Sequence, residues 1–140
     1  MPKLFDIKNG EIYVDERIVL RQNSTPQELV TAGLVFSREI EMKTGWVFRV
    51  TGPHQLSGRS ANLSLGFLNG SLKTVSFAFA EKAIANLDDL HKMQNQVLIQ
   101  ELGTPDGQND RQIIYRFPWG EIVSETDTRG GSCNIVISWM

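Results

Sequence analysis

The sequence predicts an α+β fold: a largely antiparallel sheet of about seven to eight strands with two helices on one face, in a single domain over residues 1–140. Three observations lead to this expectation. Apolar and polar residues alternate along residues 61–79 and 113–139, which is the period of half-buried strands. Two segments carry helix start and stop signals. A length of 140 residues is typical of one domain.

Composition narrows the function classes. Fourteen basic residues against sixteen acidic ones give a formal charge of −2, so nothing indicates a nucleic-acid partner, which would require a basic excess. The single Cys133 excludes an intrachain disulfide and a cysteine-based zinc site. The start of the chain has no apolar stretch of signal-peptide length, and no run approaches the ~18 apolar residues of a membrane span. We therefore expect a cytoplasmic protein without a membrane partner.

The dipeptide Asn9-Gly10 predicts a β-hairpin at the start of the chain. A two-residue loop pairs Ile7 with Ile12 and Phe5 with Val14, which places all four apolar side chains on one face. Because Asn-Gly favours the type I′ turn, we expect that turn here.

A short helix of about two turns is predicted after residue 25. Thr25 is a good N-cap, Pro26 suits the first helical position, Glu28 completes a capping box, and Gly33 provides the stop. Residues 34–42 fit either a strand or a bent connection.

Residues 46–50 predict a strand, and the following polar stretch, residues 51–60, predicts the longest loop of the chain. A second hairpin follows over residues 61–79. A two-residue loop at Asn69-Gly70 would place its two apolar rows on opposite faces. We therefore expect a three-residue loop, residues 68–70, that pairs Leu63 with Val75. The same Asn-Gly dipeptide should then form different turns at its two positions.

The longer helix is predicted over residues 87–102. Asn86 caps it, acidic residues occupy its first turn, and Gly103 ends it. We expect His91 to lie on its solvent-exposed surface. The apolar residues at helical spacing are Leu87, Leu90, Met93, Val97, Leu98 and Leu102.

The last third of the chain predicts three strands joined by turns at Phe117–Gly120 and Asp127–Gly130, each with glycine fourth. One long strand over residues 113–126, bulged at Pro118, is the alternative. The final strand, residues 135–139, is either an open edge that pairs with a second copy or is covered by the first hairpin. The order helix, glycine, strand, hairpin occurs twice, which suggests two α-then-β repeats behind the leading hairpin.

Chemistry-bearing residues are few. Neither His54 nor His91 has a carboxylate at metal-ligand spacing, and the glycines form no phosphate-binding pattern, so we expect no metal and no cofactor. Cys133 and a histidine could form a nucleophile–base pair. The position of Cys133 in an apolar row instead favours a small buried side chain. We nominate no catalytic residue.

The candidate site residues are those of a partner-binding surface. Glu121, Glu125 and Asp127 lie at alternate positions and could share one side of a strand, as an acid–base pair or as a solvated sheet face. Trp119 and Arg129 are of the types that anchor protein interfaces. Trp119 could equally pack on the core, and Arg129 could pair with Asp127 within its turn.

The run Leu102-Gly-x-Pro105, Tyr115-x-Phe-x-Trp-Gly120, Asp127-x-Arg-Gly-Gly131 and Ile135-x-Ile-x-Trp139 resembles the C-terminal signature of small bacterial proteins similar to immunity proteins of toxin–immunity loci. The hairpin Phe67-x-Asn-Gly70-x-Leu-x-x-Val75 fits the same group. The element order is also similar to the repeat of outer-membrane-assembly lipoproteins and of the β-lactamase-inhibitor protein. The resemblance covers about residues 60–139. It implies a protein partner and assigns no functional residues.

Three functions are therefore open. The first is a non-catalytic protein that binds and inhibits another protein, as an immunity protein neutralises a bacterial toxin. The second is a small-ligand-binding module that uses the sheet face. The third is a carboxylate-dependent hydrolase built on Glu121, Glu125 or Asp127.

Overall fold

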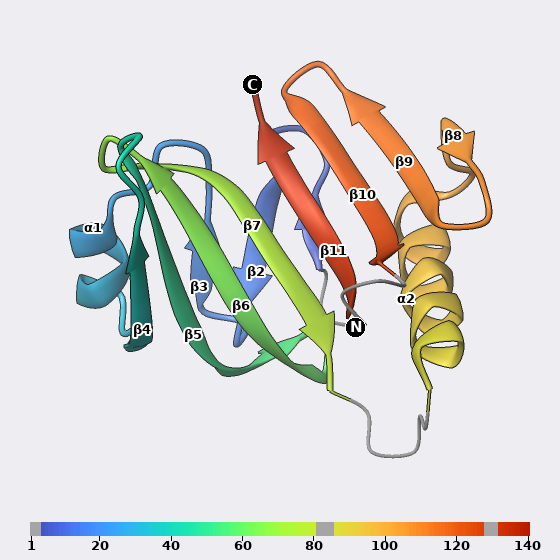
Figure 1. Cartoon of the computed structure of the whole chain (residues 1–140), viewed down its shortest axis with the longest axis horizontal. Helices are drawn as coiled ribbons and strands as arrows, with labels where there is room; N and C mark the ends of the chain where they lie inside the picture. The colour runs from blue at the N-terminus through green and yellow to red at the C-terminus, as the bar shows by residue number, and fades with distance from the viewer. Residues whose placement is uncertain (1–3, 81–85, 128–131) are drawn as a thin grey trace.

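The computed structural model describes residues 4–80, 86–127 and 132–140, apart from the side chain of Asp127. The described chain forms two antiparallel sheets and two helices, which confirms the predicted α+β class (Figure 1). The small sheet has the strand order β1-β2-β3, and the large sheet has the order β4-β5-β6-β7-β11-β10-β9-β8. In Figure 1 the small sheet lies behind the large one.

The bounds of the elements are as follows. The small sheet comprises β1 (Phe5–Asp6), β2 (Glu11–Val14) and β3 (Ile18–Leu20). The large sheet comprises β4 (Phe36–Glu41), β5 (Trp46–Leu56), β6 (Arg59–Leu68), β7 (Ser71–Phe79), β8 (Gly107–Gln108), β9 (Gln112–Phe117), β10 (Gly120–Asp127) and β11 (Ser132–Trp139). The helices are α1 (Pro26–Thr31) and α2 (Leu87–Leu102).

The large sheet consists of two halves, as the repeated element order suggested. Helix α1 precedes the four neighbouring strands β4 to β7, and helix α2 precedes the four neighbouring strands β8 to β11. The halves join through their last strands, with Ile135 opposite Phe77 and Ile137 opposite Val75. Strand β11 is therefore central, so the alternative of an open edge at residues 135–139 is wrong, and β7 rather than the first hairpin pairs with this strand.

The core lies between the large sheet on one side and the small sheet and α2 on the other. Alternate residues of β11, Cys133, Ile135, Ile137 and Trp139, are buried as predicted. Helix α2 has the predicted bounds, with Asn86 as its cap and Gly103 as its end. Its buried side chains are His91, Gln94, Val97 and Leu98. The expected surface position of His91 is therefore wrong, because the core-facing stripe of the helix includes two polar residues.

Helix α1 begins as its sequence predicts. The side chain of Thr25 accepts a hydrogen bond from the Glu28 backbone N–H, and Pro26 is the first helical residue. Leu29 is 3% exposed and holds the helix against the core. Residues 36–41, left open between strand and connection, form β4.

The first hairpin has a different loop from the predicted one. Phe5 pairs with Ile12, so the loop contains four residues, Ile7 to Gly10, and the type I′ prediction is wrong. Gly10 has a φ of 72° and its N–H donates to the Asp6 carbonyl, which closes this wider loop. Ile7 is consequently 52% exposed rather than part of the apolar face.

The predicted three-residue loop of the second hairpin, residues 68–70, is also wrong. Leu68 pairs with Ser71, so Asn69-Gly70 is a two-residue loop, and its φ values of 51° and 84° fit the type I′ turn. The odd residue that the apolar pattern demands is accommodated by a bulge beside Gly66 and Phe67 instead. The two Asn-Gly dipeptides do form different turns, but the two-residue type I′ turn is at residues 69–70 and the longer loop is at residues 7–10.

The predicted polar loop over residues 51–60 is also wrong. Strand β5 continues to Leu56 and β6 begins at Arg59, with the tight turn Ser57-Gly58 between them. A register shift between Thr51 and His54 lies at the Gly52–Pro53 peptide, which is why the segment lacks a regular strand pattern in sequence.

The turn at the start of β10 is the predicted one. Gly120 pairs with Phe117 across the two-residue loop Pro118-Trp119, so the alternative of one long strand over residues 113–126 is wrong. The predicted turn at Asp127–Gly130 lies largely outside the described residues.

Candidate functional site

The outward side of the large sheet is an uncovered surface of the described chain. Among the described elements, no helix or strand lies in front of it in Figure 1. Pairing in register aligns outward side chains into two rows across seven strands. The rows are Ile40, Phe48, Gly66, Thr74, Ser138, Glu121 and Arg116, and Arg38, Val50, Ser64, Ser76, Val136, Val123 and Ile114. These rows, with the neighbouring Met42, Trp46, Asn62, Ala78, Asn134 and Glu125, are called the open face.

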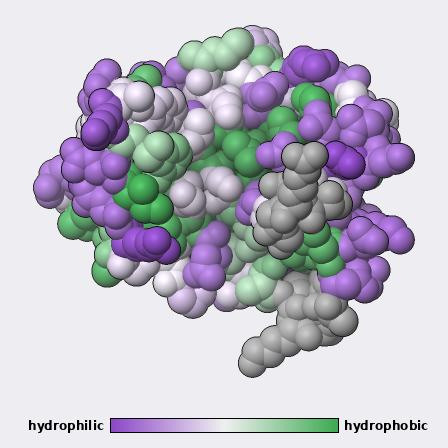
Figure 2. All heavy atoms as spheres, viewed as in Figure 1, coloured by the Kyte–Doolittle hydropathy of each residue, from purple (hydrophilic) through white to green (hydrophobic). Residues whose placement is uncertain are grey.

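The middle of the open face is uncharged and built from small side chains. A hollow of about 270 Å³ lies over β5, β6, β7 and β11, lined on the open face by Val50, Asn62, Ser64, Ser76, Ala78 and Asn134. Figure 2 shows pale and green atoms across the middle of this side and purple atoms toward both edges. Depletion of charge at the centre with a polar rim is typical of protein–protein interfaces.

One end of the open face, at β4 and β5, is mostly apolar and aromatic, and Arg38 is the exposed charged residue there. The rings of Trp46 and Phe48 stack with centroids 5.7 Å apart and an interplanar angle of 9°. Both side chains are half-buried, so each presents part of its ring to solvent. Ile40 on the adjacent strand β4 is 41% exposed, and Met42, which follows that strand, is 48% exposed. Aromatic residues and methionine are enriched at protein interfaces.

The other end, at β9 and β10, is charged and holds two of the predicted site residues. Glu121 and Glu125 are exposed and share this side, with Val123 between them. Four residues of strand separate their Cα atoms by roughly 13 Å, so the two carboxylates do not converge on one reacting atom. The side chain of Asp127 and the whole of Arg129 lie outside the described residues.

A second hollow lies at this charged end. Its volume is about 460 Å³, and its lining includes Arg116, Phe117, Glu121 and Met140. Arg116 and Glu121 are exposed, and Met140 is 80% exposed. Small-molecule sites bury most of their ligand's surface, which so exposed a lining would not do.

Trp119 is committed to contacts within the chain. Its indole N–H donates to the Ile7 carbonyl at 2.7 Å, and its ring stacks on Phe117 with centroids 4.9 Å apart. A Cβ added to Gly10 would lie 2.7 Å from the Trp119 ring, so the two are in close contact. Trp119 therefore fastens the loop of the first hairpin to the large sheet.

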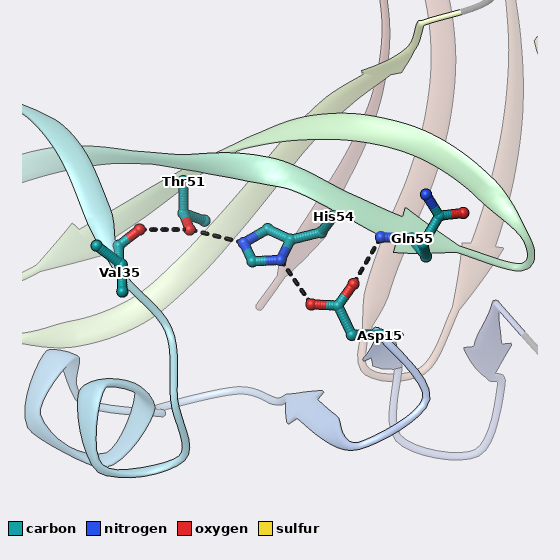
Figure 3. Close-up of polar contacts among 5 residues, drawn as sticks. All are labelled: Asp15, Val35, Thr51, His54 and Gln55. Atoms are coloured by element: carbon teal, nitrogen blue, oxygen red, sulfur yellow. Dashed lines mark hydrogen bonds and ion pairs between the residues drawn. The ribbon is translucent and has the colours of Figure 1, made fainter.

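A chain of polar contacts joins the small sheet to β5 (Figure 3). The carboxylate of Asp15 lies 2.7 Å from Nδ1 of His54 and accepts a hydrogen bond from the Gln55 backbone N–H at 2.7 Å. Nε2 of His54 lies 2.7 Å from Oγ1 of Thr51, and that hydroxyl donates to the Val35 carbonyl at 2.8 Å.

Hydroxyl, imidazole and carboxylate lie in the order of a nucleophile–base–acid triad. The hydroxyl of Thr51, however, is 1% exposed, and its one proton is directed to the Val35 carbonyl rather than to His54. The hydroxyl oxygen must then accept a hydrogen bond from the Nε2–H group of His54, whereas a nucleophile would donate its own proton to His54. We interpret the group as a structural clamp between the two sheets.

The clamp predicts a pH dependence. Burial raises the pKa of Asp15. Hydrogen bonds from Gln55 and His54 lower the pKa by more than burial raises it, so the net pKa lies below the usual 3.8. The ionised carboxylate therefore stabilises the fold fully above pH 3.8, and this contribution is lost as the pH falls through the folded pKa. Asp15→Asn should reduce the free energy of unfolding at pH 7 by about 1.5–3 kcal/mol.

The check is chemical denaturation of the wild type and Asp15→Asn at pH 7 and at pH 2.5. Asp15 has a φ of 53°, which asparagine tolerates, so the variant isolates the charge. The difference between the proteins should shrink at pH 2.5, and an equal difference at both pH values would contradict this role.

His91 and Cys133 are brought together in the core, which makes the nucleophile–base possibility concrete. Their Nδ1 and Sγ atoms are 3.5 Å apart, and the Gln94 amide donates to the same sulfur at 3.2 Å. Burial raises the pKa of Cys133 to about 11, so the thiol stays protonated at neutral pH. Burial likewise lowers the pKa of His91. With Cys133 3% exposed, the cluster packs α2 on the sheet and does not meet substrate.

Two further features concern metals and membranes. Within residues 4–80, 86–127 and 132–140, no three His, Cys, Asp or Glu side chains are grouped so as to hold a metal ion. Neither helix in that part of the chain combines the length and apolar character needed to cross a membrane.

Comparison with known proteins gives one structural match. No protein-family model matches the chain, and no curated protein matches it. Among solved structures, the chain resembles one chain of a complex described as "Rhs1-CT in complex with cognate immunity protein RhsI1". The TM-score is 0.60 over 96% of this chain and 85% of that chain, at 14% sequence identity. At this identity the match shows a shared fold, in a chain taken from a toxin–immunity complex.

The sequence interpretation missed the aromatic end of the open face. Its signal is present in Trp46-Val-Phe-Arg-Val50, where the apolar side chains Trp46, Phe48 and Val50 share one face of the strand and Arg49 lies on the other. An apolar outward face on a strand of a half-buried sheet needs a cover, and the described chain provides none. The partner-binding role of Trp119, Glu121, Glu125, Asp127 and Arg129 stays a prediction.

Proposed function

We propose that the protein is a non-catalytic inhibitor that binds another protein through the open face, as an immunity protein that neutralises a toxin. The observation that carries the proposal is an eight-stranded sheet whose outward side has no cover among the described elements and ends in exposed apolar side chains at β4 and β5. The fold shared with a chain of a toxin–immunity complex supports the same function.

The open face has the size and composition that binding requires. Six inter-strand spacings of about 4.8 Å make it roughly 29 Å wide, which can accommodate one side of a standard interface of about 800 Å² per partner. Trp46 and Phe48 are the anchors, because large aromatic side chains lose the most solvent contact on binding. Glu121 and Glu125 form part of the charged rim and would set orientation and association rate.

The experiment is protection of growing cells. The toxin-like protein encoded beside this chain's gene is expressed in a bacterial host with and without this protein, and growth is recorded. We expect growth only when both are expressed, with no loss of the toxin itself. A neighbouring gene that encodes no toxic protein, or unchanged toxicity at equal expression, would contradict the proposed function.

A further inference from the structure

Strand β4 is the longer of the two edge strands of the large sheet as the described residues form it. The strand order ends at β4 on one side and at the two-residue β8 on the other. Residues 37–41 of β4 are all exposed, so among the described residues no element buries these side chains, although α1 lies beside β4 in Figure 1. A six-residue edge presents unpaired backbone groups that can accept another strand.

The pairing with β5 fixes which backbone groups point outward. Met42 donates its N–H to the Trp46 carbonyl, and Ile40 and Phe48 are opposite each other two residues along. Hydrogen-bonded pairs alternate with non-bonded pairs in an antiparallel ladder. Arg38, Ile40 and Met42 therefore bond β5, whereas the N–H and C=O groups of Glu39 and Glu41 point away from the sheet.

Exposed apolar side chains are concentrated in the segment of the chain that contains this edge. Seven large hydrophobic residues of the described chain are exposed, and four of them lie between residues 30 and 42. They are Val30, Val35, Ile40 and Met42, with exposures of 47%, 77%, 41% and 48%. The edge thus combines unpaired backbone with apolar surface, and the apolar end of the open face continues it.

We propose that a strand of the partner protein adds to β4 and extends the sheet, and this inference rests on the proposed function. The chemistry of the added strand follows from the two sides of β4. On the inner side it meets Glu39, which pairs with Arg49 at 3.6 Å, and Glu41, so lysine or arginine is expected opposite Glu41 in particular. On the other side it lies beside Ile40, so apolar residues are expected there. The added strand alternates basic and apolar residues.

A second copy of this chain fits the edge poorly. Antiparallel pairing of two β4 strands about a two-fold axis keeps side chains of the same face opposite each other. The two registers with the greatest overlap are centred on Arg38 and on Glu39. They place arginine opposite arginine or glutamate opposite glutamate, and like charges directly opposite destabilise a strand pair. The charge pattern therefore selects a different chain of basic character.

The test uses two fluorescein-labelled seven-residue peptides, one alternating lysine and valine and one alternating glutamate and valine. Binding to the full chain is followed by fluorescence anisotropy. The lysine peptide should bind at least 10-fold more tightly than the glutamate peptide. Equal affinities, or no binding of the lysine peptide, would overturn the proposal.

Two variants separate strand pairing from charge attraction. Glu41→Pro removes an outward N–H but leaves the bonds of Ile40 and Met42 to β5 intact. Glu41→Gln keeps that N–H and removes the same charge. Glu41→Pro should weaken lysine-peptide binding at least 10-fold, and Glu41→Gln about threefold. Equal losses would mean attraction without strand pairing and would overturn the proposal. Circular dichroism checks the fold, and Glu39→Pro repeats the test at the second outward position.

The same variant distinguishes this inference from the proposed function in the growth experiment. Protection by the wild type and loss of protection with Glu41→Pro supports strand addition. Equal protection by both keeps the proposed function and overturns strand addition. A wild-type dimer that Glu41→Pro abolishes, measured by sedimentation, would show that a second copy occupies the edge and would also overturn it.

Discussion

Replacing Trp46 and Phe48 together by alanine is expected to weaken binding of the partner protein by about 100-fold or more, or about 2.7 kcal/mol. The stacked rings form the apolar end of the open face and are half-buried before any partner binds. Each ring keeps part of its surface exposed on this side, and truncation to alanine removes the proposed anchors of the interface. Calorimetric titration of the purified proteins measures the change.

The double variant must be distinguished from a poorly folded protein. The Phe48 ring lies over Gly66, where an added Cβ would approach its Cε1 atom to 2.9 Å, so truncation also removes packing. The melting temperature is recorded beside each titration. Ile99→Ala is the control, because Ile99 is 44% exposed on α2 and away from the open face. Unchanged affinity of a folded double variant would contradict the role of these rings.

Gly120→Ala is expected to lower the free energy of unfolding by about 3–4 kcal/mol and the melting temperature by roughly 10 °C. A Cβ at this position would overlap the Ser138 carbonyl oxygen and would lie 3.0 Å from Cα of Trp139, both in the backbone of the central strand β11. Gly120 also has a φ of 155°, which alanine adopts only with strain. Neither the turn nor β11 can move without breaking the β10–β11 ladder.

Gly58→Ala is the matched control for that prediction. Gly58 has a φ of 80°, but nothing lies within 4 Å of the Cβ that would be added. It carries only the backbone penalty, about 1–2 kcal/mol. Thermal unfolding of both variants separates the cost of the strained backbone from the cost of the overlap between the added Cβ and the Ser138 carbonyl. Equal destabilisation would show that the contact with Ser138 is not the cause.

Local signals predicted the helices well. The capping side chain of Thr25 and the cap at Asn86 satisfy backbone N–H groups that would otherwise lack a partner, so each residue fixes a boundary by itself. Gly103 likewise ends α2 with a positive φ. Such signals act within a few residues and need no knowledge of the tertiary fold.

The predicted turns and registers were wrong where contacts with residues distant in sequence decide them. The loop at residues 7–10 is held by the Trp119 side chain, more than one hundred residues away, and not by its Asn-Gly dipeptide alone. Beside the bulge in β7, the Leu72 carbonyl accepts a hydrogen bond from the Asn23 N–H, and the Leu72 N–H donates to the Ser24 carbonyl. Asn23 and Ser24 both precede α1. Hydrophobic alternation revealed that one residue had to be out of register, but not whether a loop or a strand would hold it.

The functional residues were only partly predictable. Glu121 and Glu125 share one face, as their alternate positions suggested. His54 and Asp15 meet only because the small sheet folds back onto β5, and nothing in the spacing of these two residues indicates it. Strand β11 is central, so the open edge of the sheet is at β4 instead. The sequence left undecided whether β4 forms a strand.

The most direct test of the open face as the binding surface is growth protection by two matched variants, Ile40→Asp and Ile99→Asp. These isoleucines are 41% and 44% exposed, but one lies on the open face and the other on α2. We expect Ile40→Asp to abolish protection against the proposed toxin partner and Ile99→Asp to protect as well as the wild type. Full protection by Ile40→Asp, or loss with Ile99→Asp alone, would contradict the assignment.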